Sequence, residues 1–187
     1  MFVIEKQKKR HLLVKRSFLE VVEDEVILSD KKETRRVFVL HPGASAILAF
    51  TPEGDIILTR QYRYPIRQES IEIPAGKLDC LEEDPLCCAK RELEEETGYA
   101  SNEFRLFQTY YPCVGYSDEI LYIYIATNCY RVEQPRPQDS DECIETFLLS
   151  LDEAKAMLKR GSFRDGKTII ALQKYILENQ EDGKDQT

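Results

Sequence analysis

The order of apolar and polar positions predicts a series of strands, one central helix and two helices near the end of the chain. Apolar or alternating runs of strand length occur at residues 18–28, 35–40, 44–50, 56–62, 70–75, 104–111, 119–126 and 145–149. Helical spacing of apolar residues occurs at 84–97, 151–160 and 167–179. Strands on both sides of a central helix, with helices at the end, predict an α/β (α+β) fold in which helices cover a mixed β-sheet.

Turn residues divide the chain into three expected parts. Pro42 and Gly43 mark a boundary after a β-rich N-terminal unit, residues 1–42. A few strands of this size are marginal alone, so we expect this unit to pack on the main domain or on a partner subunit. Its basic run at residues 6–10 is interpreted as a solvated face. Residues 43–180 form the main domain, and the polar tail 181–187 is expected to be disordered.

Charge and cysteine usage narrow the functional classes. The formal net charge of −8 argues against a general nucleic-acid binder, although metal ions could still recruit an anionic substrate. No apolar run approaches the length of a membrane span, and the N-terminus has too short an apolar run for a secretory signal. The six cysteines show no paired metal-ligand spacing. We therefore expect reduced thiols and a cytoplasmic protein without membrane or nucleic-acid partners.

The central helix has clear signals at both ends. Asp84 is a suitable N-cap, Pro85 suits the first helical position, and Gly98 suits the position after the last turn. These residues predict a helix from about Asp84 to Thr97. At 3.6 residues per turn, its core-facing stripe consists of Leu86, Ala89, Leu93 and Thr97.

The other faces of this helix and the preceding loop carry an unusual density of carboxylates: Glu83, Glu92, Glu94, Glu95 and Glu96. Arg91 can pair with Glu95 and Lys90 with Glu94, which leaves Glu92 and Glu96, on one face, without a local cation. Two such charges about 5 Å apart repel by roughly 3 kcal/mol at an effective dielectric near 20. Bound Mg²⁺ would turn this repulsion into attraction. The pattern predicts a divalent-metal site, and the alternative is an acidic surface helix.

The stretch from Gly76 to Tyr99 resembles the signature of the Nudix hydrolase family. Gly76 opens the pattern, Glu83 follows, and residues 91–99 match the family's Arg-Glu-apolar-x-Glu-Glu-x-Gly-apolar segment. Six residues rather than five separate Gly76 from Glu83, so Glu82 could take the role expected of Glu83. The resemblance implies an α/β/α sandwich.

Segments outside this signature are similar to one branch, the ADP-ribose and nucleoside-diphosphate-sugar pyrophosphatases. They are RQYRYP at 60–65, EIPAGKLD at 72–79, GYSDE at 115–119 and the β-rich N-terminal unit. The resemblance implies hydrolysis of a nucleotide-sugar substrate to a nucleoside monophosphate and a sugar phosphate. It also implies a homodimer formed through the N-terminal unit.

The resemblance assigns the metal-site and catalytic roles. Mg²⁺ is the expected cofactor, with Mn²⁺ as the alternative, and its expected ligands are the Ala75 carbonyl, Glu83, Glu92, Glu96 and Glu142. The residues expected to act in catalysis are Arg91, Glu95 and Glu142.

The general base is the least defined assignment. The loop before the last strand carries Glu142 where relatives have a metal-binding glutamate, but Ser140 stands where relatives can have the base. Serine cannot act as an unaided base at neutral pH, so Asp139, Asp141, Glu142 or a glutamate of the signature must replace it. The alternative is a solvated acidic loop.

Substrate contacts are expected from both parts of the chain. Arg63 is the first candidate for pairing with or stacking on the substrate, ahead of Arg60 and Arg67. Phe18 is a candidate for stacking on the base, but simple packing is the favoured alternative. The residues expected on the sugar side are Ser117, Asp118 and Glu119. The alternative for Asp118 and Glu119 is that they are surface residues at the start of a strand.

Three other functions are compatible with the family resemblance. A hydrolase that prefers GDP-mannose or accepts many nucleotide sugars is the nearest alternative. A nucleoside triphosphatase ranks behind it, because such chains usually lack the N-terminal unit. A catalytically inactive sensor would have a degraded signature or an added DNA-binding domain, and the sequence has neither.

Overall fold

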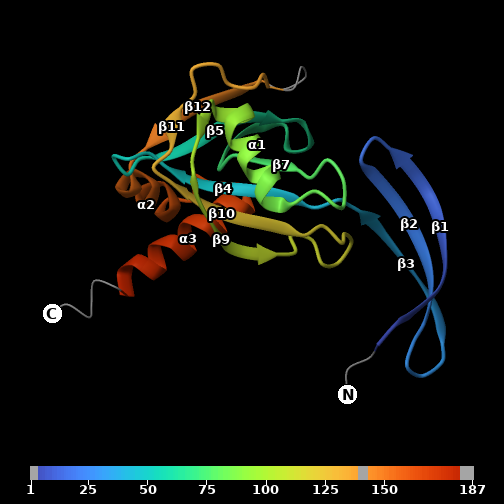
Figure 1. The fold of residues 1–187 in the computed structure, drawn as a ribbon. Helices are drawn as coiled ribbons and strands as arrows, with labels where there is room; N and C mark the ends of the chain where they lie inside the picture. Colours follow the sequence, from blue (N-terminus) through green and yellow to red (C-terminus); the bar gives the residue numbers. More distant parts are fainter. Residues whose placement is uncertain (1–3, 139–142, 182–187) are drawn as a thin grey trace. The chain divides into compact units, whose positions relative to one another are not determined.

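A computed structural model of the chain describes residues 4–138 and 143–181 (Figure 1). These residues divide into two compact units. The first contains the residues up to Gly43 together with Tyr110–Leu121, and the second contains Ala44–Thr109 and the described residues from Tyr122 onward. We describe each unit by itself.

The first unit is a three-stranded antiparallel sheet in the order β1-β2-β3, formed by β1 (Lys6–Arg16), β2 (Leu19–Ile27) and β3 (Glu33–Leu40). Val22, Asp24 and Val26 alternate with more exposed residues and are buried, as expected for one covered face. Residues 110–121 attach to β3, because Val39 donates to the Tyr116 carbonyl at 2.8 Å and accepts from Asp118 N at 3.2 Å.

The second unit contains a seven-stranded sheet with the main order β12-β5-β4-β10-β9. β6 pairs with β5 and β7 pairs with β4. The strands are β4 (Ala44–Phe50), β5 (Ile56–Arg63), β6 (Gln68–Glu72), β7 (Ala75–Lys77), β9 (Glu103–Tyr110), β10 (Leu121–Thr127) and β12 (Ile144–Leu149). A separate pair consists of β8 (Tyr99–Ala100) and β11 (Tyr130–Arg131), and one 3₁₀ turn, η1, spans Tyr64–Ile66.

Helices cover both faces of this sheet, as the alternation of side chains along β4 shows. Ile47 and Ala49 share a buried cluster with residues of α1 (Pro85–Thr97). Phe50, which points to the other face, packs against Tyr175 of α3 (Gly166–Glu181), with ring centroids 4.7 Å apart. α2 (Leu151–Lys159) packs against α3. The predicted α/β/α sandwich with a mixed sheet is confirmed.

The segment that leads into Gly76 differs from the expected single strand at 70–75. β6 ends at Glu72, and after Pro74 the chain pairs with β4 instead of β5. Pro74 has no N–H to donate to a ladder, but its carbonyl accepts from Ile47 N at 2.9 Å. This change of partner carries Ala75 and Gly76 from β5 toward α1.

Two further differences concern strands. β1 was not predicted, because its many lysines and arginines hide the strand pattern. β10 begins at Leu121, so Glu119 lies in the preceding loop and not in the strand.

Within residues 4–138 and 143–181, no helix is long and apolar enough to cross a membrane.

Candidate active site

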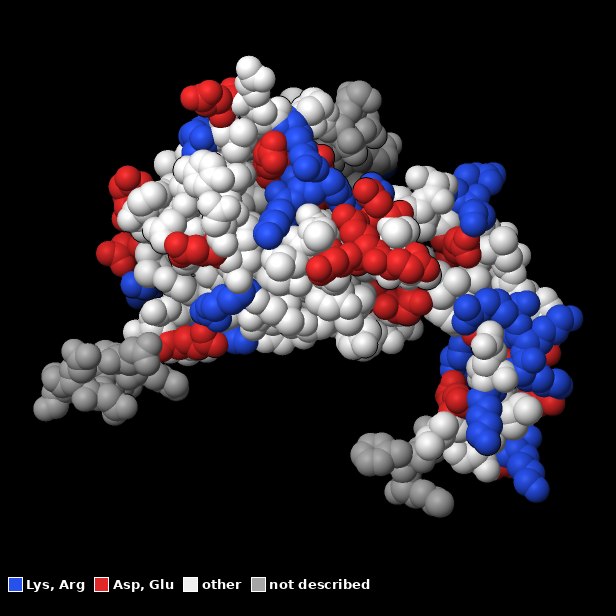
Figure 2. All heavy atoms as spheres, in the orientation of Figure 1, with Lys and Arg blue, Asp and Glu red and all other residues white. Residues whose placement is uncertain are grey.

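Helix α1 is the platform of the candidate site, and its ends agree with the sequence prediction. Asp84 accepts a hydrogen bond from Leu86 N at 2.9 Å, and Pro85 occupies the first turn. Gly98 ends the helix with φ of +69°, a left-handed conformation that favours glycine. Ala89 and Leu93 are fully buried against the sheet. Glu92, Glu94 and Glu95 are half-buried on the faces of α1 that the core does not use, and Figure 2 shows Asp and Glu side chains gathered on the surface beside α1.

Arg91 joins the carboxylates of the site. Its Nη1 lies 2.6 Å from Glu92 Oε1 and 3.1 Å from Glu95 Oε2, and its Nη2 lies 3.5 Å from Glu83 Oε1. Nη2 also donates to the Lys77 carbonyl at 3.2 Å. Burial alone would lower the pKa of Arg91, but the charge of Glu92 and bonds to both glutamates raise it above its ordinary value. The guanidinium thus remains charged and fixes the glutamates.

The expectation that Glu92 lacks a local cation was wrong. Helical spacing considers partners three or four residues away, whereas Arg91 is adjacent and reaches Glu92 because the guanidinium lies along the helix surface. The expected pair of Arg91 with Glu95 is confirmed. Glu94 receives Arg136 in place of the expected Lys90, and Lys90 lies over the Phe104 ring.

Glu96 is held by the main chain. Only 5% of its surface is exposed, and its Oε2 accepts a hydrogen bond from Ala75 N at 2.9 Å. Next to this bond, a Cβ on Gly76 would lie 2.0 Å from the carboxyl carbon and Oε1 of Glu92. The carboxylate of Glu92 therefore occupies space that any side chain at position 76 would fill.

The structure distinguishes the two glutamates of the loop before α1. Glu83 is half-buried, accepts from Asp79 N at 2.6 Å and faces Arg91, whereas Glu82 is exposed. The extra residue of the loop is thus accommodated without displacing Glu83 from the site. The role of Glu83 as a metal ligand stays a prediction.

The chemistry of these donors suits a hard divalent cation. In the part of the chain that the structure describes, no three His, Cys, Asp or Glu side chains are already gathered as a metal site. Instead, Arg91 donates hydrogen bonds to the carboxylates of Glu92 and Glu95, and Ala75 N–H donates one to the carboxylate of Glu96. Carboxylate and main-chain oxygens are the ligands that Mg²⁺ and Mn²⁺ prefer. The glycine at position 76 leaves room for the carboxylate of Glu92.

Arg63, the first candidate for substrate contact, is firmly held. Its Nε and Nη2 donate to Glu72 Oε1 and Oε2 at 2.9 and 2.8 Å. Lys167, at the start of α3, also bonds Glu72. Burial alone would raise the pKa of Glu72, but hydrogen bonds from Arg63 and the charge of Lys167 lower it to about 2.

The two other arginines have local partners. Arg60 Nη1 lies 3.1 Å from Glu145 Oε2 of β12 and its guanidinium lies over the Phe147 ring. Arg67 adopts φ of +53° after η1 and lies over Tyr64.

Three of the four candidates of the first unit contact His41, and the fourth, Ser117, bonds Glu119. The Phe18 ring meets the His41 ring edge-on with centroids 5.3 Å apart, and 42% of Phe18 is exposed. Asp118 Oδ1 accepts from His41 N at 2.9 Å, Glu119 Oε1 lies 3.8 Å from His41 Nδ1, and Ser117 Oγ accepts from Glu119 N. Asp118 and Glu119 therefore have structural partners. Glu142 and its alternatives Asp139, Ser140 and Asp141 lie outside the described residues.

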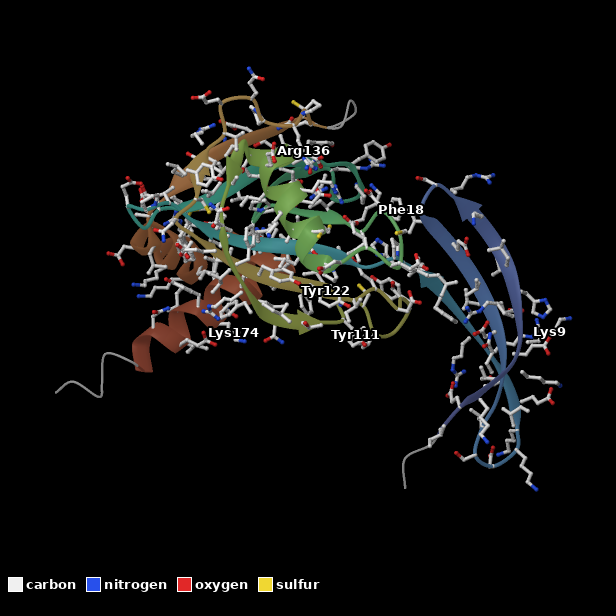
Figure 3. All side chains as sticks on the ribbon, viewed as in Figure 1. Lys9, Phe18, Tyr111, Tyr122, Arg136 and Lys174 are labelled. Carbon is white, nitrogen blue, oxygen red and sulfur yellow. The ribbon has the colours of Figure 1, made fainter. Side chains whose placement is uncertain are left out.

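Sequence reasoning missed three charged residues beside the expected site. Glu72 was treated as the polar position of an alternating strand, yet it is buried. Lys167 belongs to a helix far along the chain. Arg136 donates from its backbone N to Glu94 Oε1 at 3.1 Å, and its Nη1 lies 3.8 Å from Glu95 Oε1 (Figure 3). The one signal in the sequence was a glutamate between the apolar residues Ile71 and Ile73; Lys167 and Arg136 had none.

Comparisons with known proteins identify the family of the chain. The family described as NUDIX domain matches residues 39–172. The chain belongs to the Nudix family, which confirms the resemblance seen in its sequence. The chain is 38% identical to an ADP-ribose pyrophosphatase of Bacillus subtilis (strain 168), over 83% of each chain. It is 39% identical to a methanol dehydrogenase activator of Bacillus methanolicus, again over 83% of each chain.

A second group of relatives carries another substrate name. A GDP-mannose pyrophosphatase of Yersinia enterocolitica is 34% identical to the chain, over 76% of this chain and 77% of the relative. Among solved structures, the crystal structure of an ADP compounds hydrolase matches with a TM-score of 0.78 over 96% of each chain. Its 18% identity makes it evidence for the fold.

Proposed function

We propose that this protein is a divalent-metal-dependent pyrophosphohydrolase that cleaves the diphosphate of ADP-ribose or a related nucleoside diphosphate sugar. The observation that carries the proposal is the cluster around Arg91, which brings Glu83, Glu92 and Glu95 together beside Glu96. The ADP-ribose pyrophosphatase of Bacillus subtilis supports the choice of ADP-ribose, and the products would be AMP and ribose 5-phosphate.

Each residue has a defined part in this proposal. Mg²⁺, or Mn²⁺ in its place, would be held by Glu92 and Glu96, with Glu83, the Ala75 carbonyl and Glu142 as further ligands. When bound, the cation offsets the charge of the diphosphate and lowers the pKa of a coordinated water. Arg91 orients Glu92 and Glu95 through the contacts described above. Arg63 provides a fixed guanidinium for a phosphate oxygen.

We assign the general base, which removes a proton from the attacking water, to Glu142 or to Glu95. Glu95 lies between Arg91 and Arg136, with its Oε2 3.1 Å from Arg91 Nη1 and its Oε1 3.8 Å from Arg136 Nη1. Substrate contacts from Phe18, Arg60, Ser117, Asp118 and Glu119 are part of the same proposal and await the variants that test them.

The experiment is release of phosphate from ADP-ribose, GDP-mannose, UDP-glucose and dGTP with Mg²⁺ or Mn²⁺, in an assay coupled to a phosphatase. We expect the highest turnover with ADP-ribose and its loss in Glu95→Gln and Glu96→Gln. Glu83→Gln should lower turnover at least tenfold, whereas the adjacent exposed variant Glu82→Gln should not. Activity on none of the four substrates contradicts the proposal.

GDP-mannose is the second candidate substrate, because relatives at 34% identity carry that name. Equal or greater kcat/KM for GDP-mannose than for ADP-ribose would favour this alternative. The same assay therefore decides between the two.

We also propose that the protein is a cytoplasmic homodimer that associates through the N-terminal sheet. This sheet exposes large apolar side chains, including Leu12, Leu13, Val14 and Val37, each 47–56% exposed. All six cysteines are free thiols, which suits a reducing compartment. Sedimentation equilibrium should give a dimer that Leu12→Lys combined with Val14→Lys dissociates. A wild-type monomer at every concentration would exclude the dimer.

A further inference from the structure

A buried charge cluster joins three elements of the second unit beside the candidate site. Glu72 of β6 contacts Arg63 at the end of β5 and Lys167 in the first turn of α3. Lys167 Nζ also lies 3.2 Å from Asp165 Oδ1. The side chains of Glu72, Lys167 and Asp165 are 6%, 11% and 18% exposed, but that of Arg63 is 39% exposed. Arg63 is therefore the member of the cluster that solvent and ligands can reach.

The geometry of the pair fixes the orientation of the guanidinium. Because both Glu72 oxygens accept from Arg63, the guanidinium plane cannot rotate without breaking two charge-assisted bonds. Lys167 bonds Oε2, the same oxygen that receives Arg63 Nη2, so this oxygen has two charged donors. Burying a carboxylate is costly unless it is paired and hydrogen-bonded, and Lys167 supplies the second partner.

Hydrogen bonds and the main-chain segment 73–75 connect this cluster to Glu96. Ile73 N donates to Thr168 Oγ1 at 2.9 Å, and Thr168 Oγ1 donates to Asp165 Oδ2 at 2.5 Å. Two residues after Ile73, Ala75 N donates to Glu96. The hydrogen bonds of Arg63 to Glu72 raise the pKa of Arg63, and the negative charges of Glu72, Glu96 and Asp165 raise it further. Thr168, at the start of α3, thus holds the segment 73–75, and Ala75 of this segment holds Glu96.

We propose that Glu72 and Lys167 are positioning residues that hold the Arg63 guanidinium ready for a phosphate oxygen of the substrate. This inference rests on the proposed function, since it assigns Arg63 to the diphosphate. Glu72 and Lys167 act through Arg63 and do not touch the substrate. Loss of either residue should weaken substrate binding more than it slows the chemical step.

The test is a double-mutant cycle of Arg63→Ala and Lys167→Met, with KM and kcat measured separately on ADP-ribose and GDP-mannose. We expect Lys167→Met to raise KM about tenfold with kcat within about threefold of wild type. Lys167→Arg should restore KM. In the Arg63→Ala background, Lys167→Met should raise KM no further, because its effect passes through Arg63.

Matched variants keep the test decisive. Lys155→Met removes the partner of Asp152 in an exposed ion pair of α2 and should leave KM unchanged. If Lys167→Met does not fold, Glu72→Gln replaces it in the cycle with the same expectation. Additive effects of the two substitutions on KM, or an equal loss in kcat, would overturn the inference while leaving the proposed function intact. Wild-type inactivity on all nucleotide sugars would instead remove the proposed function itself.

Discussion

At the scale of the residue, Gly76 makes a sharp prediction. A Cβ at this position would lie 2.0 Å from the Glu92 carboxylate, so Gly76→Ala must displace that carboxylate. The obstacle is the end of a flexible side chain, and its movement should cost little folding free energy. We expect kcat/KM to fall about 100-fold while Tm changes by less than about 2 °C. Steady-state kinetics and thermal unfolding measure the two effects.

Gly166→Ala is the matched control for this substitution. A Cβ at Gly166 meets nothing within 4 Å, and the residue lies at the start of α3. Its activity and Tm should remain close to those of the wild type. If Gly76→Ala retains full activity, the carboxylate of Glu92 is not needed in the place where the structure holds it.

Individual residues also show what the sequence could not reveal about the site. The signature located Glu83, Arg91, Glu92, Glu95 and Glu96 because their spacing along one helix and its preceding loop is local information. It did not reveal that Arg91 bonds Glu92 or that Ala75 N–H bonds Glu96. Side-chain direction and main-chain geometry decide such contacts, and neither is written in residue spacing.

At the scale of the element, the caps of α1 allow a prediction of stability. Asp84→Ala removes the acceptor for Leu86 N and should lower the free energy of unfolding by about 1 kcal/mol. Gly98→Ala places a Cβ at φ of +69° and should cost about 1 kcal/mol as well. Urea unfolding of each variant measures these changes.

Cys87→Ala, on the exposed side of the same helix, provides the control and should leave stability within about 0.5 kcal/mol of wild type. A cap variant as stable as this control would show that packing alone defines the ends of α1. Catalysis should survive the Asp84 and Gly98 substitutions in proportion to the folded fraction, since neither residue contacts the carboxylate cluster.

Elements were predictable where local signals agreed and were missed where tertiary contacts decided. Caps and periodicity defined α1, and turn residues defined the hairpin between β4 and β5. The charged residues of β1 concealed a strand that pairing with β2 stabilises. The division of 70–75 into β6 and β7 depends on two different neighbours, β5 and β4, which only the folded sheet brings together.

At the scale of the whole molecule, Glu72 links the stability of the second unit to pH. Its pKa is lowered from 4.5 to about 2 in the folded state. A group with a depressed folded pKa contributes stability above its unfolded pKa and loses it as pH falls through the folded value. This window runs from about pH 4.5 to about pH 2, and the contribution is on the order of 3 kcal/mol.

The measurement is the free energy of unfolding in urea at a series of pH values from 7 to 2, for wild type and Glu72→Gln. The variant cannot titrate at position 72, so its stability should fall less steeply below pH 4.5 than that of the wild type. Asp24→Asn removes a carboxylate of the first unit whose pKa Arg10 lowers, and it tests whether the effect is general. Parallel curves for wild type and Glu72→Gln would mean that Glu72 keeps its proton affinity on folding. The ion pairs of Glu72 with Arg63 and Lys167 would then contribute no net stability to the folded state.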